Sequence, residues 1–345
     1  MKTRLASAFS FSSDGGMLKR ASITGLGFLV ILVVLLGFYW SGEPAAFSVQ
    51  QRTAQKLALV GNDYVVGSTT TVALITVAET LLNKPGGYLS NDISPPGIYL
   101  DNIPNWEFGA LVQVRDLART FRESFSRSQS QSTEDPDLII SEPKFHFSND
   151  SWLFPATESE YAEAISRLDS YLARISDPAN TDAQFYARAD NLADWLLAVE
   201  SRLGSLSQRL SASVRQSRVN TDTSGETVVT QSAQSTPVRS EVSVKTPWLQ
   251  IDDVFYEARG ATWALMHFLK AVEVDFKDVL EDKNAEASLS QIIRELEASQ
   301  RSIFFPIILN GSGFGVFANH SLAMANYISR ANAAIIDLRN LLSQG

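Results

Sequence analysis

The chain of 345 residues contains no cysteine and only three histidines. The absence of cysteine excludes disulfides, thiolate nucleophiles, thiolate zinc sites and lipid attachment at a Cys side chain. His146, His267 and His320 lie far apart in the sequence, and none stands in a His-x-x-x-His or Glu-x-x-His pairing. This spacing predicts no metal site, and the sequence contains no cofactor fingerprint, so we expect no metal and no cofactor.

Charged residues are also scarce, at 19% of the chain against 45% hydrophobic residues. This balance is typical of a globular protein with one membrane segment and argues against extended disorder. The net charge is −9, yet the first twenty residues carry a local +3, from Lys2, Arg4, Lys19 and Arg20 against Asp14. The remainder is therefore acidic. Because no Lys/Arg stripe interrupts it, we expect no nucleic-acid partner.

One long apolar run, ASITGLGFLVILVVLLGFYW at 21–40, contains twelve Leu, Ile, Val or Phe residues and no charge. As a helix it would be about 30 Å long, which is the thickness of the hydrocarbon core of a bilayer. Its twelve large apolar side chains would favour insertion by about 4 to 7 kcal/mol. The run therefore predicts a single transmembrane helix, with the lipid bilayer as its partner.

Charge and aromatic residues orient this segment. Tyr39 and Trp40 stand at its C-terminal end, where amphipathic rings prefer the membrane interface, and the N-terminal cations outnumber Arg52 and Lys56 beyond it. We therefore expect the N-terminus inside the cell and the bulk of the chain outside the cytoplasm. The alternative is a cleaved signal peptide, but the sequence WSGEPAA that follows offers no A-x-A-like cleavage site. The segment is predicted to be an uncleaved signal anchor.

Apolar periodicity predicts helices beyond the anchor. Residues 41–64 resemble an exit segment, and 68–83 form a helix that is dense enough in apolar residues for full burial. The sequence KPGG at 84–87 ends this helix, and a Pro/Gly-rich loop occupies 88–105. A second helix is predicted over 106–127, with one apolar face made by Ala110, Val114, Leu117, Phe121 and Phe125.

Two capping-box patterns follow a polar linker, Thr157 with Glu160 and Thr181 with Gln184. In such a box the Thr hydroxyl and the acidic or amide side chain bind free backbone N–H groups at a helix start. Apolar residues after each box alternate in steps of four and three, which predicts two helices that form an antiparallel, coiled-coil-like hairpin. These residues are Tyr161, Ile165, Leu168, Leu172 and Ile175, then Phe185, Ala189, Leu192, Leu196, Val199, Leu203, Leu206 and Leu210.

The composition changes to Ser, Thr, Gln and Val at 217–246, which predicts a flexible insertion or a small hairpin of strands 227–230 and 242–244. Low complexity favours the flexible insertion. Helices return at 247, and the first has two apolar stripes and so belongs at the centre of a bundle. Ser288 caps a short helix, and 324–342 forms the last. The predicted fold is all-α, with segments 1–20 (cytoplasmic tail), 21–40 (anchor), 41–127 (first helices), 128–216 (linker and hairpin), 217–246 (insertion) and 247–345 (C-terminal helices).

Three phrases are specific enough to compare with known families: NKPGGYL at 83–89, DNIPNWEFGA at 101–110 and DVFYEARG at 253–260. With the N-terminal anchor and the ending at 320–342, they resemble the bacterial family of domain of unknown function 2333 over almost the whole chain. The resemblance implies an inner-membrane protein of a Gram-negative cell, whose bulk lies in the periplasm. It implies no activity and identifies no functional residue.

The Pro/Gly-rich loop and the helix after it supply the candidate catalytic groups. Asp101 and Glu107 are carboxylates that could act as acid and base on a glycan, as glycoside hydrolysis requires. Each also has an ordinary structural role. Asp101 suits a turn, Asn105 is a natural N-cap, and Glu107 near a helix start complements the helix dipole.

Aromatic residues supply the candidate ligand- or partner-binding groups: Trp106 after the loop, and Tyr256, Trp263 and His267 on the second stripe of the central helix. The same residues would serve equally well in a bundle core. The uncharged, aromatic segment 303–317 either contacts the membrane or a partner, or forms a buried loop between helices.

These observations favour a membrane-tethered envelope scaffold that binds other envelope proteins or further copies of itself, because no catalytic constellation is present. One alternative is a peptidoglycan-acting enzyme that uses Glu107 as its acid. The other is a ligand-sensing bundle that signals through a partner, with a pocket near Tyr256, Trp263 and His267. The sequence alone assigns no reaction.

Overall fold

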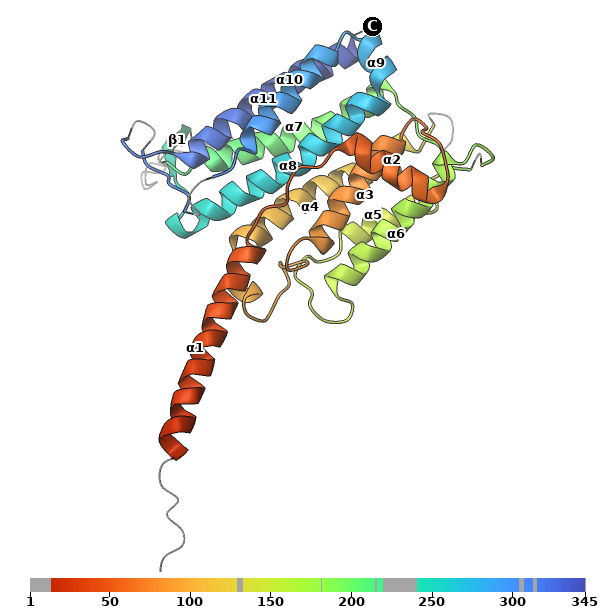
Figure 1. Cartoon of the computed structure of the whole chain (residues 1–345). Helices are drawn as coiled ribbons and strands as arrows, with labels where there is room; N and C mark the ends of the chain where they lie inside the picture. The colour runs from red at the N-terminus through yellow and green to blue at the C-terminus, as the bar shows by residue number, and fades with distance from the viewer. Residues whose placement is uncertain are drawn as a thin grey trace, which may run out of the picture.

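The computed structural model describes residues 14–128, 133–180, 182–214, 216–219, 241–303, 307–312 and 315–344. Apart from one two-stranded ribbon, the regular structure in these residues is helical, which confirms the predicted fold class. Figure 1 shows a long helix, α1 (Asp14–Trp40), that leaves a bundle formed by the other helices. Residues 1–13 of the predicted cytoplasmic tail lie outside the described residues.

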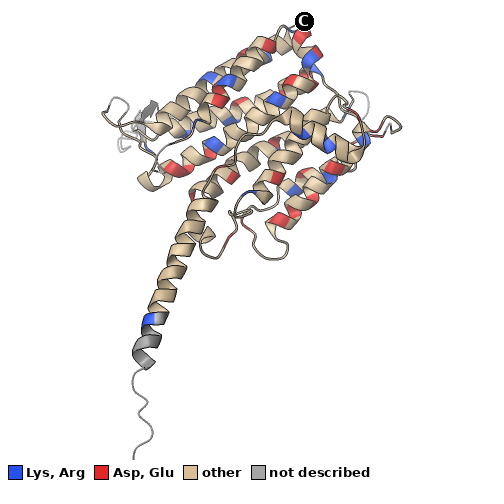
Figure 2. Ribbon diagram, viewed as in Figure 1, with Lys and Arg blue, Asp and Glu red and all other residues tan. Residues whose placement is uncertain are grey.

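Helix α1 contains the predicted apolar segment. Within the described residues, one stretch, Ser22–Trp40, is long and apolar enough to cross a membrane by length and composition. Figure 2 shows an uncharged ribbon over most of α1, whereas charged residues are spread over the bundle. Large apolar side chains such as Ile31 and Leu35 are exposed along this helix. Such a helix is typical of a membrane anchor or a signal sequence.

Helix α8 (Ile251–Asp275) is the centre of the bundle, as its two apolar stripes predict. On one side of it lie α2 (Val49–Val60), α3 (Ser68–Asn83), the 3-10 turn η1 (Gly97–Tyr99), α4 (Asn102–Thr120), the π-helical turn η2 (Phe121–Phe125), α5 (Leu138–Phe145) and α6 (Thr157–Ser176). On the other lie α7 (Ala189–Ser211), the 3-10 turn η4 (Trp248–Gln250), α9 (Lys277–Asp282), α10 (Glu286–Ser299) and α11 (His320–Ser343). Helix α3 has the predicted bounds and is almost completely buried.

The predicted hairpin is wrong. Helix α6 packs against α3 and α5, whereas α7 packs along α11, so the two helices bury their apolar faces against other partners. Helix α7 also begins at Ala189, several residues after the predicted start, because residues 183–188 are not helical. Phe185 in this segment packs against Phe121, Phe125 and Phe276. A heptad stripe specifies that a face is buried, but it does not specify which helix covers that face.

The predicted capping positions are also corrected. Helix α4 begins at Asn102, with Asp101 as its N-cap in place of Asn105. The hydroxyl of Thr157 donates to the carbonyls of Ser148 and Ser151, so it does not cap α6. Thr181 of the second box lies outside the described residues. Helix α10 begins at Glu286, before the predicted cap at Ser288, and helices α2 and α5 were not predicted.

Part of the predicted flexible insertion is an antiparallel ribbon of β1 (Gln216–Val219) and β2 (Glu241–Val244), in which Gln216 lies opposite Val244. The strand predicted at 242–244 is therefore confirmed. Its partner is 216–219, and the other candidate strand, 227–230, lies outside the described residues.

Helices α4 and α8 cross with their backbones almost in contact. A Cβ atom at Gly109 of α4 would overlap the carbonyl oxygen of Glu257, and one at Gly260 of α8 would overlap the carbonyl oxygen of Trp106. The neighbouring indole rings of Trp106 and Trp263 lie 5.1 Å apart between their centroids. Only glycine permits so close an approach, because any side chain would force the helices apart.

We therefore expect Gly260→Ala and Gly109→Ala each to lower the free energy of unfolding by about 3 kcal/mol through overpacking. The matched control is Gly204→Ala in α7, where the nearest atom to an added Cβ would lie 3.7 Å away. This control should be neutral or slightly stabilising, by up to about 1 kcal/mol, because alanine is the better helix former. Denaturant unfolding of the full chain in detergent measures all three, and equal stability of the three variants would contradict the close crossing.

Candidate functional site

The three sequence phrases meet where α1 joins the bundle. We call this region the anchor junction; it contains residues 37–47, 84–100, the first half of α4 and the middle of α8. Its parts come from distant positions in the sequence, so only the fold brings them together. Buried polar groups fix each part to the next.

A buried ion pair fixes the loop after α3. The Lys84 ammonium contacts the Glu107 carboxylate, and the two side chains are 1% and 0% exposed. The Glu107 oxygens also accept from the backbone N–H of Leu89 at 2.9 Å and of Ser90 at 2.8 Å, and from the Ser90 hydroxyl. The ammonium donates to the Gly87 carbonyl as well. One carboxylate of α4 therefore organises the whole 84–90 turn.

This arrangement bears on the predicted catalytic role of Glu107. Burial raises the pKa of Glu107, while Lys84 and the hydrogen-bond donors oppose that rise. A raised pKa suits a general acid, but both oxygens already have partners and the side chain is shielded from solvent. Asp101 is exposed at the N-cap of α4, in a different environment. The geometry of Glu107 is that of a structural ion pair.

Arg259 of α8 fixes the segment that follows α1. Its guanidinium binds the Glu43 carboxylate in a bidentate manner, with the Nε to Oε1 distance 2.6 Å. The remaining nitrogen, Nη1, donates to the backbone carbonyls of Ser299 and Arg301 at 3.1 and 3.0 Å. Arg259 is buried and thus joins three segments: the chain after α1, helix α8 and the end of α10. Such a planar, multiply bonded site suits arginine and not lysine.

His267 lies about two helical turns after Arg259 on α8 and also contacts the segment that follows α1. Its Nδ1 lies 2.7 Å from the Trp263 carbonyl, and its Nε2 accepts from the backbone N–H of Phe47 at 3.1 Å. The Phe47 and His267 rings stack with centroids 3.9 Å apart. These partners require a neutral ring with the proton on Nδ1. Burial agrees with this, because it lowers the pKa of His267 to about 4.

The outer end of α1 itself packs against the bundle. A Cβ atom at Gly86, whose φ is +89°, would lie 2.8 Å from Cγ of Trp40, so the ring rests on this glycine. A Cβ atom at Gly37 would lie 3.5 Å from Cβ of Pro96 and 3.8 Å from Cδ2 of Leu100. The last turn of α1 is therefore in contact with the Pro/Gly-rich loop.

The predicted aromatic site is divided between core and surface. Trp106, Trp263 and His267 come together in the core at the α4–α8 crossing, where Phe47 packs on Trp263 and His267. Tyr256 lies half-buried on the same helix. The three histidines do not converge: His146 lies beside Glu142 at the end of α5, and His320 begins α11. Among the described residues, no group of three or more His, Asp or Glu side chains could hold a metal ion.

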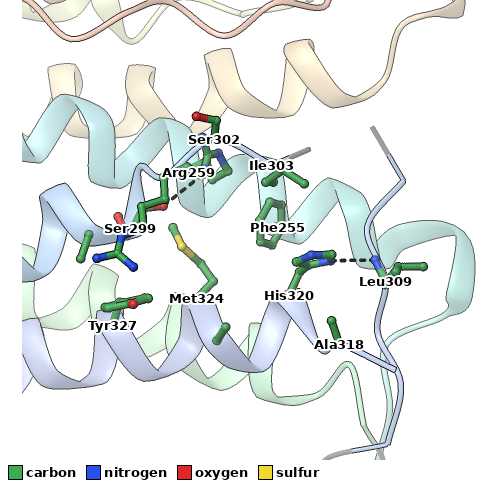
Figure 3. A pocket seen from close by; sticks show the side chains of 13 residues that line it. Phe255, Arg259, Ser299, Ser302, Ile303, Leu309, Ala318, His320, Met324 and Tyr327 are labelled. Carbon is green, nitrogen blue, oxygen red and sulfur yellow. Dashed lines mark hydrogen bonds between the residues drawn. The ribbon is translucent and has the colours of Figure 1, made fainter. Parts of the chain in front are cut away.

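A cavity of about 300 Å³ lies between α8, α10 and α11 (Figure 3). Phe255 and Met324 face each other across it, with Tyr327 at one end and His320 at the other. Nδ1 of His320 accepts from the Leu309 N–H at 2.9 Å. The volume of this cavity is at the lower limit for a small-molecule site, and its lining is mostly apolar.

A second hollow, of about 360 Å³, opens at the N-terminal ends of α4 and α8. We call it the Trp248 groove. Trp248 is 81% exposed and Leu249 is 76% exposed on its wall. The groove also includes Asp101, the predicted loop residue. Its lining consists of Asp101, Asn102, Trp248, Leu249, Ile251, Asp252, Ile307, Ile308 and Asn310.

Sequence reasoning missed the polar groups that build the junction. Lys84, Glu43 and Phe47 carry no local signal of their roles, because their partners are distant in the sequence. Arg259 did carry one. It lies four residues after Phe255 within an apolar stripe, and a charge in such a stripe needs a buried partner.

Comparison with known proteins gives one family. The sequence model of a family described as an uncharacterized protein conserved in bacteria (DUF2333) matches residues 13–345, as the resemblance of the three phrases implies. No curated protein and no solved structure matches the chain.

We expect Glu107→Gln to lower the free energy of unfolding by about 3 kcal/mol or more, because it leaves Lys84 buried without its anion. The matched control is Glu123→Gln on the exposed side of the π-helical turn, which should change stability by less than about 0.5 kcal/mol. Denaturant unfolding of the full chain measures both. Unchanged stability of Glu107→Gln would contradict the structural role of this ion pair.

The burial of His267 should make stability depend on pH. The folded pKa of His267, about 4, lies below the ordinary value of 6.5, so the unfolded chain binds the proton more readily. Stability should therefore fall as the pH decreases from about 6.5 to 4, by up to about 3 kcal/mol. Unfolding of the wild type and of His267→Gln over this range isolates the effect, since glutamine can accept from Phe47 but does not titrate. Parallel curves for the two proteins would contradict it.

Proposed function

The chain belongs to the uncharacterized bacterial family DUF2333, and from its architecture we propose that it is a membrane-tethered scaffold that binds other proteins of the bacterial envelope. Helix α1 is the tether in the inner membrane, with the N-terminus in the cytoplasm and the bundle in the periplasm. The observation that carries this proposal is the anchor junction, in which Trp40, Glu43 and Phe47 are each held by the bundle. The bundle is therefore held in a fixed position relative to α1.

The same contacts favour an uncleaved anchor over a signal peptide. The bundle provides the last turn of α1 with partners of its own: Gly86 under the Trp40 ring, and Pro96 and Leu100 beside Gly37. A leader that is removed after export has no use for such partners. A permanent anchor gains a fixed exit angle from them.

The Trp248 groove is the surface that suits a protein partner. Exposed tryptophan, together with aliphatic neighbours, is typical of the residues that dominate protein interfaces. Ile307 is also 67% exposed there, and Asp101 and Asp252 provide acidic groups at the rim. The groove therefore suits a segment with apolar side chains and a basic residue. This surface contains Asp101 and Asn102, where the Pro/Gly-rich loop ends and α4 begins.

The alternatives have less support from the geometry. An enzyme that uses Glu107 needs this carboxylate to reach a substrate, and both of its oxygens are bound to Lys84, Leu89 and Ser90. A ligand-sensing bundle would use the cavity beside Phe255 and Met324 in place of the packed Trp263 and His267.

Crosslinking from the rim of the groove tests the scaffold. The wild-type chain has no cysteine, so Lys245→Cys provides a single thiol close to Trp248. A membrane-impermeant photo-crosslinker attached to this thiol in spheroplasts should give a reproducible adduct with an envelope protein. The adduct should be lost when Trp248→Ser is added, because a central tryptophan often contributes about 2 kcal/mol or more to binding.

The matched control is Glu286→Cys, an exposed position at the start of α10, which should be labelled but should give no such adduct. If neither thiol reacts until the membrane is lysed, the periplasmic orientation is wrong. If an adduct forms at Lys245→Cys but persists with Trp248→Ser, the groove is not the binding surface.

A further inference from the structure

Two loops on the side of the bundle that α1 leaves expose large apolar side chains. One is the Pro/Gly-rich loop that contains η1, and the other precedes α6. Phe154 is 98% exposed and Tyr99 is 76% exposed, and the remaining members are each half exposed or more. We call them the apolar tips; they are Ile93, Ile98, Tyr99, Trp152, Leu153 and Phe154.

The loops that carry the apolar tips are well fixed. The side-chain amide of Asn91 donates to the Ser151 carbonyl and to the Glu158 carboxylate, each at 2.8 Å, and so joins the two loops. Thr157 holds the second loop through the carbonyls of Ser148 and Ser151. The Pro/Gly-rich loop is held by the Glu107 carboxylate, which accepts from the backbone N–H groups of Leu89 and Ser90. The apolar tips are therefore displayed by a rigid support.

The position of the first loop along α1 follows from its contact with Gly37. Gly37 lies inside the apolar stretch Ser22–Trp40, and it packs against Pro96 and Leu100. Residues beside this position lie at the depth of the outer end of the stretch. Figure 1 shows that the loop between α3 and α4 and the loop before α6 both project from the side of the bundle that α1 leaves. The first loop thus lies against the outer end of the apolar stretch, and the second loop faces the same side of the bundle.

The chemistry of the two loops suits uncharged lipid. Neither 88–102 nor 147–157 contains a lysine or an arginine, while Asp92, Asp101 and Asp150 supply negative charge. Attraction to anionic headgroups needs basic residues, so it cannot drive binding here. Trp, Tyr and Phe side chains instead favour the boundary between headgroups and acyl chains.

We propose that the apolar tips insert into the outer face of the same membrane that α1 crosses. This inference rests on the proposed anchor and adds two further points of attachment to it. Side chains at such positions enter the headgroup and acyl boundary by roughly 5–10 Å. Three points of attachment fix the orientation of the bundle, and a single helix would leave it free to tilt.

Lipid-attached quenchers test this in the full chain. Single cysteines at Tyr99, Phe154, Leu29 and Glu286 are labelled with a small fluorophore, and each protein is reconstituted in nanodiscs of zwitterionic lipid. Lipids that carry a quencher near the headgroup should reduce the fluorescence at Tyr99→Cys and Phe154→Cys. A quencher deep in the acyl chain should reduce it at Leu29→Cys, and Glu286→Cys should respond to neither. The loss of fluorescence at Tyr99→Cys and Phe154→Cys should persist at high salt.

The outcomes distinguish a failure of this proposal from a failure of the proposed anchor. If Leu29→Cys is quenched but 99 and 154 are not, α1 spans the membrane and the apolar tips do not insert. If 99 and 154 are shielded from an aqueous quencher without lipid quenching, a protein covers them, such as a second copy of the chain, and the proposal is wrong. If Leu29→Cys is not quenched, the proposed anchor fails. A response at 99 and 154 that requires anionic lipid would also overturn the apolar mechanism.

Discussion

The close crossing of α4 and α8 is the constraint on which the rest of the structure depends. Gly109 and Gly260 allow the two backbones to approach almost to contact, and Trp106 packs on Trp263 beside them. This approach places residues on both helices at fixed distances from one another. Side chains near the crossing then contact two segments, the loop after α3 and the segment after α1.

Buried polar groups complete the junction from this crossing. Glu107 holds Lys84 and the following turn, while Arg259 and His267 hold the chain that leaves α1. Such groups are costly to bury, and apolar replacements of similar volume often fold equally well. Their directional hydrogen bonds do more than apolar contacts can, because they specify one position for each loop. A bundle that holds α1 at one angle has a physical reason to use them.

A fixed junction also explains how the exposed surfaces are used in our proposal. The apolar tips and the Trp248 groove both expose apolar side chains that a free bundle in water would bury. They differ in their neighbours. The loop of Tyr99 contacts the apolar stretch of α1 through Pro96 and Leu100, whereas the groove lies at the N-terminal ends of α4 and α8 and is lined by Asp101 and Asp252 beside its apolar residues. This difference is the reason that we propose lipid for the first surface and a protein for the second.

The sequence by itself determined the apolar N-terminal helix, the helical class and the bounds of α3, because each depends on composition and on apolar periodicity within one segment. It also identified the buried faces of α4, α6 and α7. Tertiary structure alone decided that α7 packs along α11 and not on α6, that Asp101 and not Asn105 caps α4, and that Glu107 binds Lys84. Periodicity shows that a face is buried, but the partner of that face lies far away in the sequence. Only the packing of the whole bundle, with glycine where α4 meets α8, selects it.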